Sequence, residues 1–314
     1  PAQMAHQFYS PRDLRFHLYE VLNAERLTRF SYFADHNRES FGMVLDAAGQ
    51  IGETLLKPLL TVMDRDEPQL TDGKIRVHPQ MGSIIRTFGE DGWINAPFSY
   101  DEGGQQLPAT IMNAATFVFG AANYSASVFP FLTTGAANLL RSFGSPELVE
   151  RFTPLMYAGR WQGTMALTEP DAGSSLSDIS TSAEPTDEPG QYRIRGQKIY
   201  ISAGDHDAVE NVVHLMLAKI KGGPAGAKGI SLFAVPQKRP NGNTLVDNDV
   251  MTAGVYHKMG YKGAPIAHLM VGSGDGTIGY LVGEPHQGLR YMFQMMNEAR
   301  VGVGMNAVSI GTAA

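Results

Sequence analysis

The sequence of 314 residues contains no cysteine. This absence excludes disulfide bonds, a catalytic thiolate and any metal site with cysteine ligands. A basic surplus is also lacking, because the formal net charge is -6 at pH 7. Binding to nucleic acid needs a clustered basic surface that meets the phosphates. We therefore expect no nucleic-acid partner.

Long uninterrupted apolar runs are missing as well. The most apolar long stretch, residues 114–132, contains Gly120, Asn123 and Pro130, and is too polar and broken for a membrane span. No N-terminal segment has the basic start, apolar run and cleavage site of a signal peptide. The nine histidines are scattered without a ligand-type spacing, which predicts no metal site. A cytoplasmic protein without a membrane span is the expectation.

The first half of the chain is predicted to be helical. Apolar residues recur every three or four positions over residues 39–63, and a looser pattern of this kind covers residues 108–143. Ser145 followed by Pro146 has the sequence of a helix N-cap with proline in the first turn. The helix that it opens is expected to run from Pro146 to Tyr157 and to stop at Gly159.

After Gly159 the pattern changes to short strand-like segments separated by glycine and proline clusters. These segments are residues 162–167, 191–202, 209–219, 230–236, 267–271 and 279–282. They predict a compact antiparallel β-domain, sandwich or barrel, before a helical pattern returns from about Gly288.

The fold class is therefore α+β with several domains. We expect an N-terminal extension at residues 1–36, a helical domain at 37–159, a β-domain at 160–284 and the beginning of a C-terminal helical domain at 285–314. The last helical pattern has no stop signal before Ala314. We therefore expect that this sequence contains only the beginning of that last domain.

Two segments have the composition of a ligand site. Leu167 to Ser175 reads LTEPDAGSS, in which proline and glycine predict a turn with exposed N–H groups and hydroxyls. Gly196 to Gly204 reads GQKIYISAG, where Tyr200 and Ser202 would share one face of a strand. Taken singly, the first is an ordinary surface turn and the second an ordinary strand with a core tyrosine.

Together and at their spacing, the two segments resemble the flavin motifs of the acyl-CoA dehydrogenase family. The resemblance extends over nearly the whole chain. It includes FGSPELVERFTPLMYAGRW before the first motif, Lys258-Met259-Gly260 after the second, and MNEARVG near the end. Phe8 to Leu27 resembles an extension in one bacterial branch of the family. That branch includes enzymes for 3-methylmercaptopropanoyl-CoA, in dimethylsulfoniopropionate degradation, and for fatty acyl-CoA.

The resemblance implies FAD as the cofactor and an acyl-CoA as the substrate. The implied flavin contacts are Met165, Leu167, Thr168, Gly173, Ser174, Tyr200, Ile201 and Ser202. Ser174, Asn297 and Arg300 are the implied substrate contacts. Asp205-His206-Asp207 also fits the branch, although its composition alone predicts a surface loop. The family resemblance further implies a homo-oligomer, a dimer or tetramer, whose neighbouring subunit contributes to the flavin site.

The implied reaction is the α,β-dehydrogenation of an acyl-CoA thioester by an oxidoreductase that passes electrons to an electron-transfer flavoprotein. A base must remove a weakly acidic α-proton, which requires a site that stabilises the enolate-like oxygen and excludes water. Some family members have this glutamate at the position of Ala299. Glu298 lies one residue earlier, about 100° around a helix. It is a weak candidate, and we expect the base beyond residue 314.

Three alternatives remain open at this point. An acyl-CoA oxidase uses the same half-reaction with oxygen as the acceptor. A non-catalytic flavin-binding relative that associates with DNA would need a basic surface, which the net charge does not provide. The residues of this chain alone are expected to be inactive, because the base is not among them.

Overall fold

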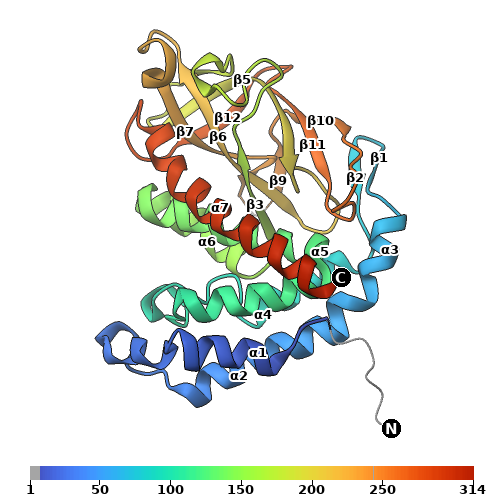
Figure 1. The fold of residues 1–314 in the computed structure, drawn as a ribbon. Helices are drawn as coiled ribbons and strands as arrows, with labels where there is room; N and C mark the ends of the chain where they lie inside the picture. The colour runs from blue at the N-terminus through green and yellow to red at the C-terminus, as the bar shows by residue number, and fades with distance from the viewer. Residues whose placement is uncertain (1–7, 243) are drawn as a thin grey trace. The chain divides into compact units, whose positions relative to one another are not determined.

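The computed structural model describes residues 8–242 and 244–314 (Figure 1). The chain divides into two compact units, which we name the helical unit and the sheet unit. The helical unit comprises the described residues up to Met63 with Asn95–Val128 and Arg300–Ala314. The sheet unit comprises Asp64–Ile94 and Phe129–Ala299. The first seven residues of the expected N-terminal extension lie outside the described residues, and the four expected domain ranges stay a prediction.

The helical unit consists of short and long helices over its described residues. They are α1 (Pro11–Phe16), η1 (His17–Val21), η2 (Ala24–Arg29), η3 (Ser31–Phe33), α2 (Arg38–Ile51), η4 (Gly52–Leu56), η5 (Lys57–Leu59), η6 (Tyr100–Glu102), most of α3 (Leu60–Arg65), the first part of α5 (Ala109–Phe143) and the last part of α7 (Gly288–Ala313). In α2 the buried residues Phe41, Leu45 and Ala48 recur at helical spacing, as the apolar pattern predicts.

The helix predicted over residues 39–63 is not continuous. The α-helix ends at Ile51, and a wider turn and a 3₁₀ turn precede α3. Pro58 lies in the 3₁₀ turn, and proline cannot donate the backbone hydrogen bond that a continuous helix needs. The long helix α5 confirms the helical prediction for residues 108–143. It is kinked at Asn123, whose side-chain amide donates to the carbonyl oxygen of Leu56 at 3.1 Å.

In the sheet unit, longer helices precede and follow the strands of a large sheet, and two short turns lie between its strands. They are α4 (Met81–Glu90), the second part of α5, α6 (Pro146–Tyr157), the short turns η7 (Leu176–Asp178) and η8 (Gly226–Gly229), and the first part of α7. The predicted start of α6 is confirmed. Ser145 accepts a hydrogen bond from the backbone N–H of Leu148, and Pro146 occupies the first turn.

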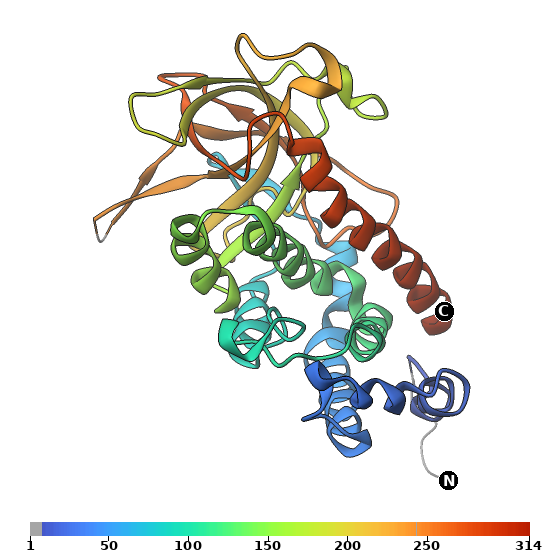
Figure 2. The same cartoon turned by 90° about the vertical axis from the view of Figure 1, so that its left-hand side faces the viewer.

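Among the described residues, the strands form one curved sheet of eight and two small hairpins. They are β1 (Gln69–Thr71), β2 (Lys74–Arg76), β3 (Trp161–Ala166), β4 (Ser182–Pro185), β5 (Gln191–Ser202), β6 (Asn211–Ile220), β7 (Ile230–Pro236), β8 (Lys238–Asn241), β9 (Thr244–Asp247), β10 (Val250–Val255), β11 (Ile266–Val271) and β12 (Thr277–Leu281). The large sheet has the order β10-β11-β5-β12-β7-β6-β3, with β4 paired to β5 and β6. The β8–β9 hairpin projects from this curved sheet (Figure 2).

The β-rich central segment is confirmed, but the prediction that it is antiparallel is wrong in part. β3 and β4 both pair with β6 in parallel. Parallel neighbours need a crossover connection, and here β4 and β5 separate β3 from β6 in the chain. Periodicity of single strands does not show the direction of a partner that is distant in sequence.

Glycine at position 163 allows α5 to lie close to β3. A Cβ atom at Gly163 would be 2.5 Å from the Cβ of Ala136, which is too close for any side chain. The backbone N–H of Gly163 donates to Thr133 Oγ1 at 3.1 Å, so this approach is also hydrogen-bonded. β3, which leads into the first motif, is thus anchored on α5.

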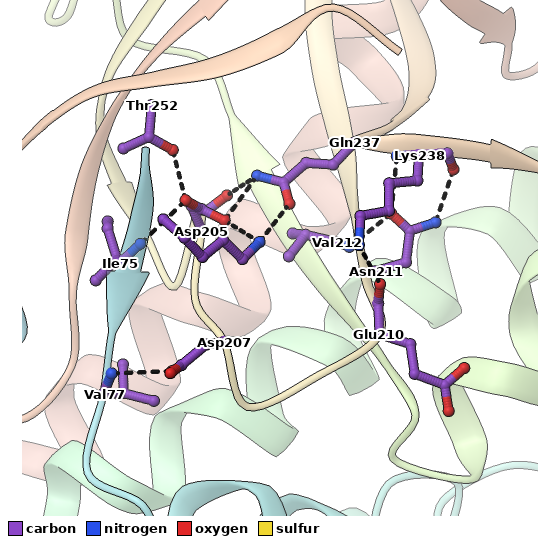
Figure 3. Close-up of polar contacts among 12 residues, drawn as sticks. Ile75, Val77, Asp205, Asp207, Glu210, Asn211, Val212, Gln237, Lys238 and Thr252 are labelled. Atoms are coloured by element: carbon purple, nitrogen blue, oxygen red, sulfur yellow. Dashed lines mark hydrogen bonds and ion pairs between the residues drawn. The ribbon is translucent and has the colours of Figure 1, made fainter. Parts of the chain in front are cut away.

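The β1–β2 hairpin is held against the sheet by the carboxylate of Asp205, which is buried (Figure 3). Asp205 pairs with the ammonium group of Lys74. It also accepts from Thr252 Oγ1 at 2.6 Å, from Gln237 Nε2 at 3.1 Å and from the backbone N–H of Ile75 at 3.3 Å. Burial raises the pKa of Asp205, but the Lys74 charge and the hydrogen bonds outweigh it, so the pKa lies below its usual value.

The surface loop predicted for Asp205-His206-Asp207 is therefore wrong for its first two residues. His206 is completely buried, and its ring lies edge-on to Phe129 at 5.0 Å between centroids. Within the described part of the chain, neither ring nitrogen has a hydrogen-bond partner. Burial is the main cause that lowers the pKa of His206 to about 3, so the ring is neutral at pH 7. Only Asp207 is exposed.

None of the helices in the described residues has the length and apolar character that a membrane crossing requires. This includes α5, in which Asn123 and Pro130 interrupt the apolar residues.

We predict that Asp205→Asn lowers the free energy of unfolding by about 3 kcal/mol, since the change leaves the Lys74 ammonium without its counter-charge in a partly buried site. Asp207→Asn is the matched control, because Asp207 pairs with an exposed Arg76 at 3.3 Å and should lose less than about 1 kcal/mol. Urea denaturation at pH 7 measures both. Equal losses in the two variants would show that the Asp205 network does not hold the hairpin.

Candidate functional site

The first motif continues β3 into a tight turn. The N–H of Glu169 donates to the carbonyl oxygen of Ala172 at 2.8 Å, and the N–H of Ala172 donates back to Glu169 at 3.1 Å. Pro170 and Asp171 form the tip of this turn. The turn predicted from the proline and glycine of LTEPDAGSS is confirmed.

β3 is the last strand in the order of the large sheet, and its edge away from β6 is its outer edge. Just after β3, the carbonyl oxygen of Thr168 accepts from the N–H of Ile199 in β5 at 2.9 Å. The N–H of Gly163 points to this outer edge, where Thr133 accepts it. Because N–H groups alternate along a strand, those of Met165 and Leu167 face the same edge. These are backbone donors that a ligand with acceptor atoms can use.

The second motif contains a β-bulge that changes the direction of Tyr200. Lys198 pairs with Leu269 and Ile201 pairs with Ala267. Between these two pairs, β5 advances by three residues while β11 advances by two, so β5 contains one extra residue. Tyr200 has φ +58°, in the left-handed region, and the residue is 59% exposed. A bulge of this kind inserts one residue and re-aims side chains. The regular strand assumed from the sequence is therefore interrupted at Tyr200.

A buried ion pair joins the two motifs. Lys198 is completely buried and donates to Glu169 Oε1 at 2.8 Å and to the carbonyl oxygen of Leu167 at 2.9 Å. Glu169 also accepts from the N–H and hydroxyl of Ser180 at 2.6 and 2.8 Å, and from the N–H of Thr181 at 3.1 Å. This pair was not predicted from the sequence, because β5 is rich in polar residues and its pattern does not show that Lys198 is buried and requires a partner.

The protonation of the pair follows from these contacts. Burial raises the pKa of Glu169, but the Lys198 charge and the donors of Thr181 and Ser180 outweigh it and lower the pKa to about 2. Burial also lowers the pKa of Lys198 to about 8, against the opposing effect of Glu169. Both groups are therefore predominantly charged at pH 7, and Glu169 is a structural group with little basicity.

The two motifs line one cavity of about 250 Å³ in the sheet unit. Seven of the eight residues expected to contact flavin lie on it, namely Met165, Leu167, Thr168, Gly173, Tyr200, Ile201 and Ser202. The remaining lining residues, Leu132, Leu176 and Met296, come from α5, η7 and α7. They were not expected from the sequence, because no local motif places these distant segments at one site.

The other expected site residues lie elsewhere. Ser174 and Asn297 are exposed and do not line the cavity, and Arg300 belongs to the part of α7 in the helical unit. Glu298 accepts a hydrogen bond from Asn138 Nδ2 at 2.9 Å. It is two helix positions from Met296, about 200° around α7, and so points away from the cavity that Met296 lines. No carboxylate lines the cavity among the residues that the structure describes.

The fold and this site define an α+β protein in which a curved sheet presents a small, mostly apolar cavity. Residues 164–272 match the family model of the acyl-CoA dehydrogenase middle domain. The chain belongs to the acyl-CoA dehydrogenase family.

Individual relatives extend this likeness to both sides of the middle domain. The chain is 34% identical to a 3-methylmercaptopropionyl-CoA dehydrogenase of Ruegeria pomeroyi, over 95% of this chain and 50% of the relative. It is also 34% identical to a butyryl-CoA dehydrogenase of Syntrophomonas wolfei, over 96% of this chain and 51% of the relative. The chain thus spans about half the length of the curated relatives it matches. An acyl-CoA dehydrogenase of Bacillus anthracis, solved with FAD, has a TM-score of 0.70 at 22% identity, over 88% of this chain and 42% of that one.

We predict that Glu169→Gln lowers the free energy of unfolding at pH 7 by about 3 kcal/mol, because the buried Lys198 loses its counter-charge. The pKa of Glu169 falls from 4.5 to about 2 on folding, so its contribution is complete above pH 4.5 and is lost as the pH falls towards 2. The stability difference between wild type and variant should therefore narrow from pH 5 downwards.

Glu210→Gln is the control for this comparison. Glu210 pairs with Arg160 at 2.8 Å, but both side chains are about half exposed, and the loss should stay below about 1 kcal/mol. Urea titrations of the three proteins at several pH values measure the effects. A difference that stays constant from pH 5 to pH 3 would contradict a charged Glu169.

Proposed function

We propose that this chain provides the flavin- and acyl-CoA-binding part of an FAD-dependent acyl-CoA dehydrogenase. The supporting observation is that two segments implied by the sequence to contact flavin line one cavity, although they come from different strands. Family membership supports the same proposal. The α,β-dehydrogenation of an acyl thioester is the corresponding reaction, and FAD, when bound, supplies the acceptor for the hydride that leaves the β-carbon.

The cavity has the properties that a planar ring system requires. Its volume of about 250 Å³ is just below the usual range of about 300–1,000 Å³ for small-molecule pockets, so it suits one ring system rather than a whole dinucleotide. Leu167, Ile201 and Met165 provide apolar surface, and Tyr200 provides an aromatic face. The N–H groups of Met165 and Leu167 on the outer edge of β3 provide donors for ring heteroatoms. We therefore propose that the flavin ring lies here.

Removal of the α-proton needs a basic carboxylate in a place that excludes water. Glu169 is unsuitable, because its ion pair with Lys198 and its N–H donors hold its pKa at about 2. Glu298 is unsuitable, because it contacts Asn138 and does not line the cavity. We propose that the base lies outside residues 1–314. In this proposal Leu132, Leu176 and Met296 exclude water, and Ser174, Asn297 and Arg300 contact the substrate.

The names of the relatives suggest the substrate class. The relatives are named for 3-methylmercaptopropionyl-CoA and for butyryl-CoA, and we propose a substrate of this kind or another fatty acyl-CoA. An electron-transfer flavoprotein is the proposed acceptor. A cytoplasmic homo-oligomer, dimer or tetramer, is the proposed form, as the family resemblance implies.

We predict that the full-length protein reduces an artificial dye with 3-methylmercaptopropanoyl-CoA or a short-chain acyl-CoA as the electron donor. The panel of substrates also includes medium- and long-chain acyl-CoAs. Glu298→Gln should keep at least about half of the turnover, because the group lies away from the cavity. Loss of turnover by about 10³-fold in this variant, at unchanged substrate affinity, would instead identify Glu298 as the base. The assay reports kcat and KM for each acyl-CoA.

A second prediction concerns the electron acceptor. In the full-length protein, flavin reduced by substrate should stay reduced in air for much longer than one turnover. Stopped-flow absorbance of the flavin after mixing with oxygenated buffer measures this rate. Fast return of the oxidised spectrum would favour an acyl-CoA oxidase over the proposed dehydrogenase.

A further inference from the structure

We propose that Tyr256 is a positioning residue that holds the Tyr200 ring in place at the wall of the cavity. This proposal rests on the proposed flavin site. Tyr256 lies just after β10 and does not itself line the cavity. Its role is to fix the aromatic face that Tyr200 presents to the bound ring.

Tyr200 needs such support because of its own geometry. Tyr200 lines the cavity but remains 59% exposed, so its ring is not fixed by burial in the core. Its backbone has φ +58°, a conformation that bulky residues rarely adopt. Strained conformations of this kind persist where the surrounding structure determines them, and they occur often at ligand sites. The bulge determines where the backbone of Tyr200 lies, but the ring can still turn about its side-chain bonds.

An aromatic residue, Tyr256, contacts this ring. The two ring centroids are 4.5 Å apart with an angle of 39° between planes. This is within the distance range of favourable aromatic pairs. The strand order β10-β11-β5 explains how residues so distant in the sequence meet, because β10 and β5 flank β11 in the sheet.

Tyr256 is itself held from several directions. Its backbone N–H donates to the carbonyl oxygen of Ile266 at 2.9 Å. The next residue, His257, pairs with Glu67 at 2.6 Å, and Lys262 pairs with the same carboxylate at 3.3 Å. On the side of β11, the His268 ring lies nearly parallel to Tyr256, at 16° and 6.5 Å between centroids. His268 Nε2 is in turn hydrogen-bonded to Gln197 Oε1 at 3.0 Å.

The consequence is preorganisation of the proposed flavin site. A ring that turns freely must be ordered when a ligand binds, and this ordering weakens the affinity. A ring that is already fixed by a neighbour does not lose this freedom. Aromatic pairs of this strength correspond to about a two- to tenfold change in affinity.

The experiment is a titration of the full-length apoprotein with FAD, followed by flavin fluorescence and by circular dichroism of the bound flavin. We expect Tyr256→Ala to raise the dissociation constant about two- to tenfold and to change the dichroism of the flavin bands. Tyr256→Phe keeps the ring and should restore both. Met259→Ala is the matched control, because Met259 lies in the same loop, is fully exposed and should bind FAD like wild type.

A double-mutant cycle with Tyr200→Ala separates this inference from the proposed function. If Tyr256 acts through Tyr200, the double variant binds FAD no more weakly than Tyr200→Ala alone. The inference is overturned if the two substitutions weaken FAD binding additively. It is also overturned if Tyr256→Ala binds FAD like wild type while Tyr200→Ala binds it more weakly. Neither result would contradict the flavin site. Unchanged FAD binding by Tyr200→Ala would overturn the flavin site itself. Thermal unfolding checks that each variant folds, and Tyr256→Leu replaces Tyr256→Ala if that variant does not.

Discussion

The ion pair between Lys198 and Glu169 is the interaction on which the cavity depends. Two charges that are removed from water are tolerated only when their hydrogen bonds are satisfied. Here Lys198 binds Leu167 and Glu169, and Glu169 receives the donors of Ser180 and Thr181. The pair thus connects the end of β3, the turn that follows it, the chain before β4 and the middle of β5. An apolar pair of similar volume would fill the space, but would not specify which atoms of these segments meet.

A second buried carboxylate lies at the other end of the same segment. Asp205, seven residues after Lys198 (205 − 198), pairs with Lys74 and binds Thr252 and Gln237. Between these two ion pairs, Tyr200 and Ala203 have φ +58° and +50°. Each such residue costs on the order of 1–3 kcal/mol. The two ion pairs hold the ends of the strained segment in place, and the backbone bond from Ala203 to Pro265 at 2.8 Å holds its middle.

Features that depend on short-range sequence could be predicted. The N-cap at Ser145, the helix to Tyr157, the strand Gln191–Ser202 and the turn after Leu167 each follow from residues within a few positions. The two motifs were identified because their compositions are unusual as a pair. Their shared cavity followed from a family resemblance, since single-sequence spacing does not fix which strands are neighbours.

Features that depend on distant partners could not be predicted in this way. The segment Asp205-His206-Asp207 is polar, which favours a surface loop. Asp205 is nevertheless buried, because it pairs with Lys74, which lies 131 positions earlier in the chain on the β1–β2 hairpin. Leu132, Leu176 and Met296 meet at the cavity from three separate elements.

The bulge at Tyr200 opposes local preference outright, because an aromatic residue in a strand favours an extended backbone. Local rules fail here where the structure presents a side chain to a cavity, which is where strained exceptions are expected in functional proteins. An extended backbone at this position would continue the pairing with β11 and turn the ring to the face set by strand alternation. The left-handed residue instead changes the direction of the side chain, and Tyr200 lines the cavity together with its chain neighbours Ile201 and Ser202. A β-bulge re-aims the side chain at its position, so the bulge is the feature that allows Tyr200 to join this wall.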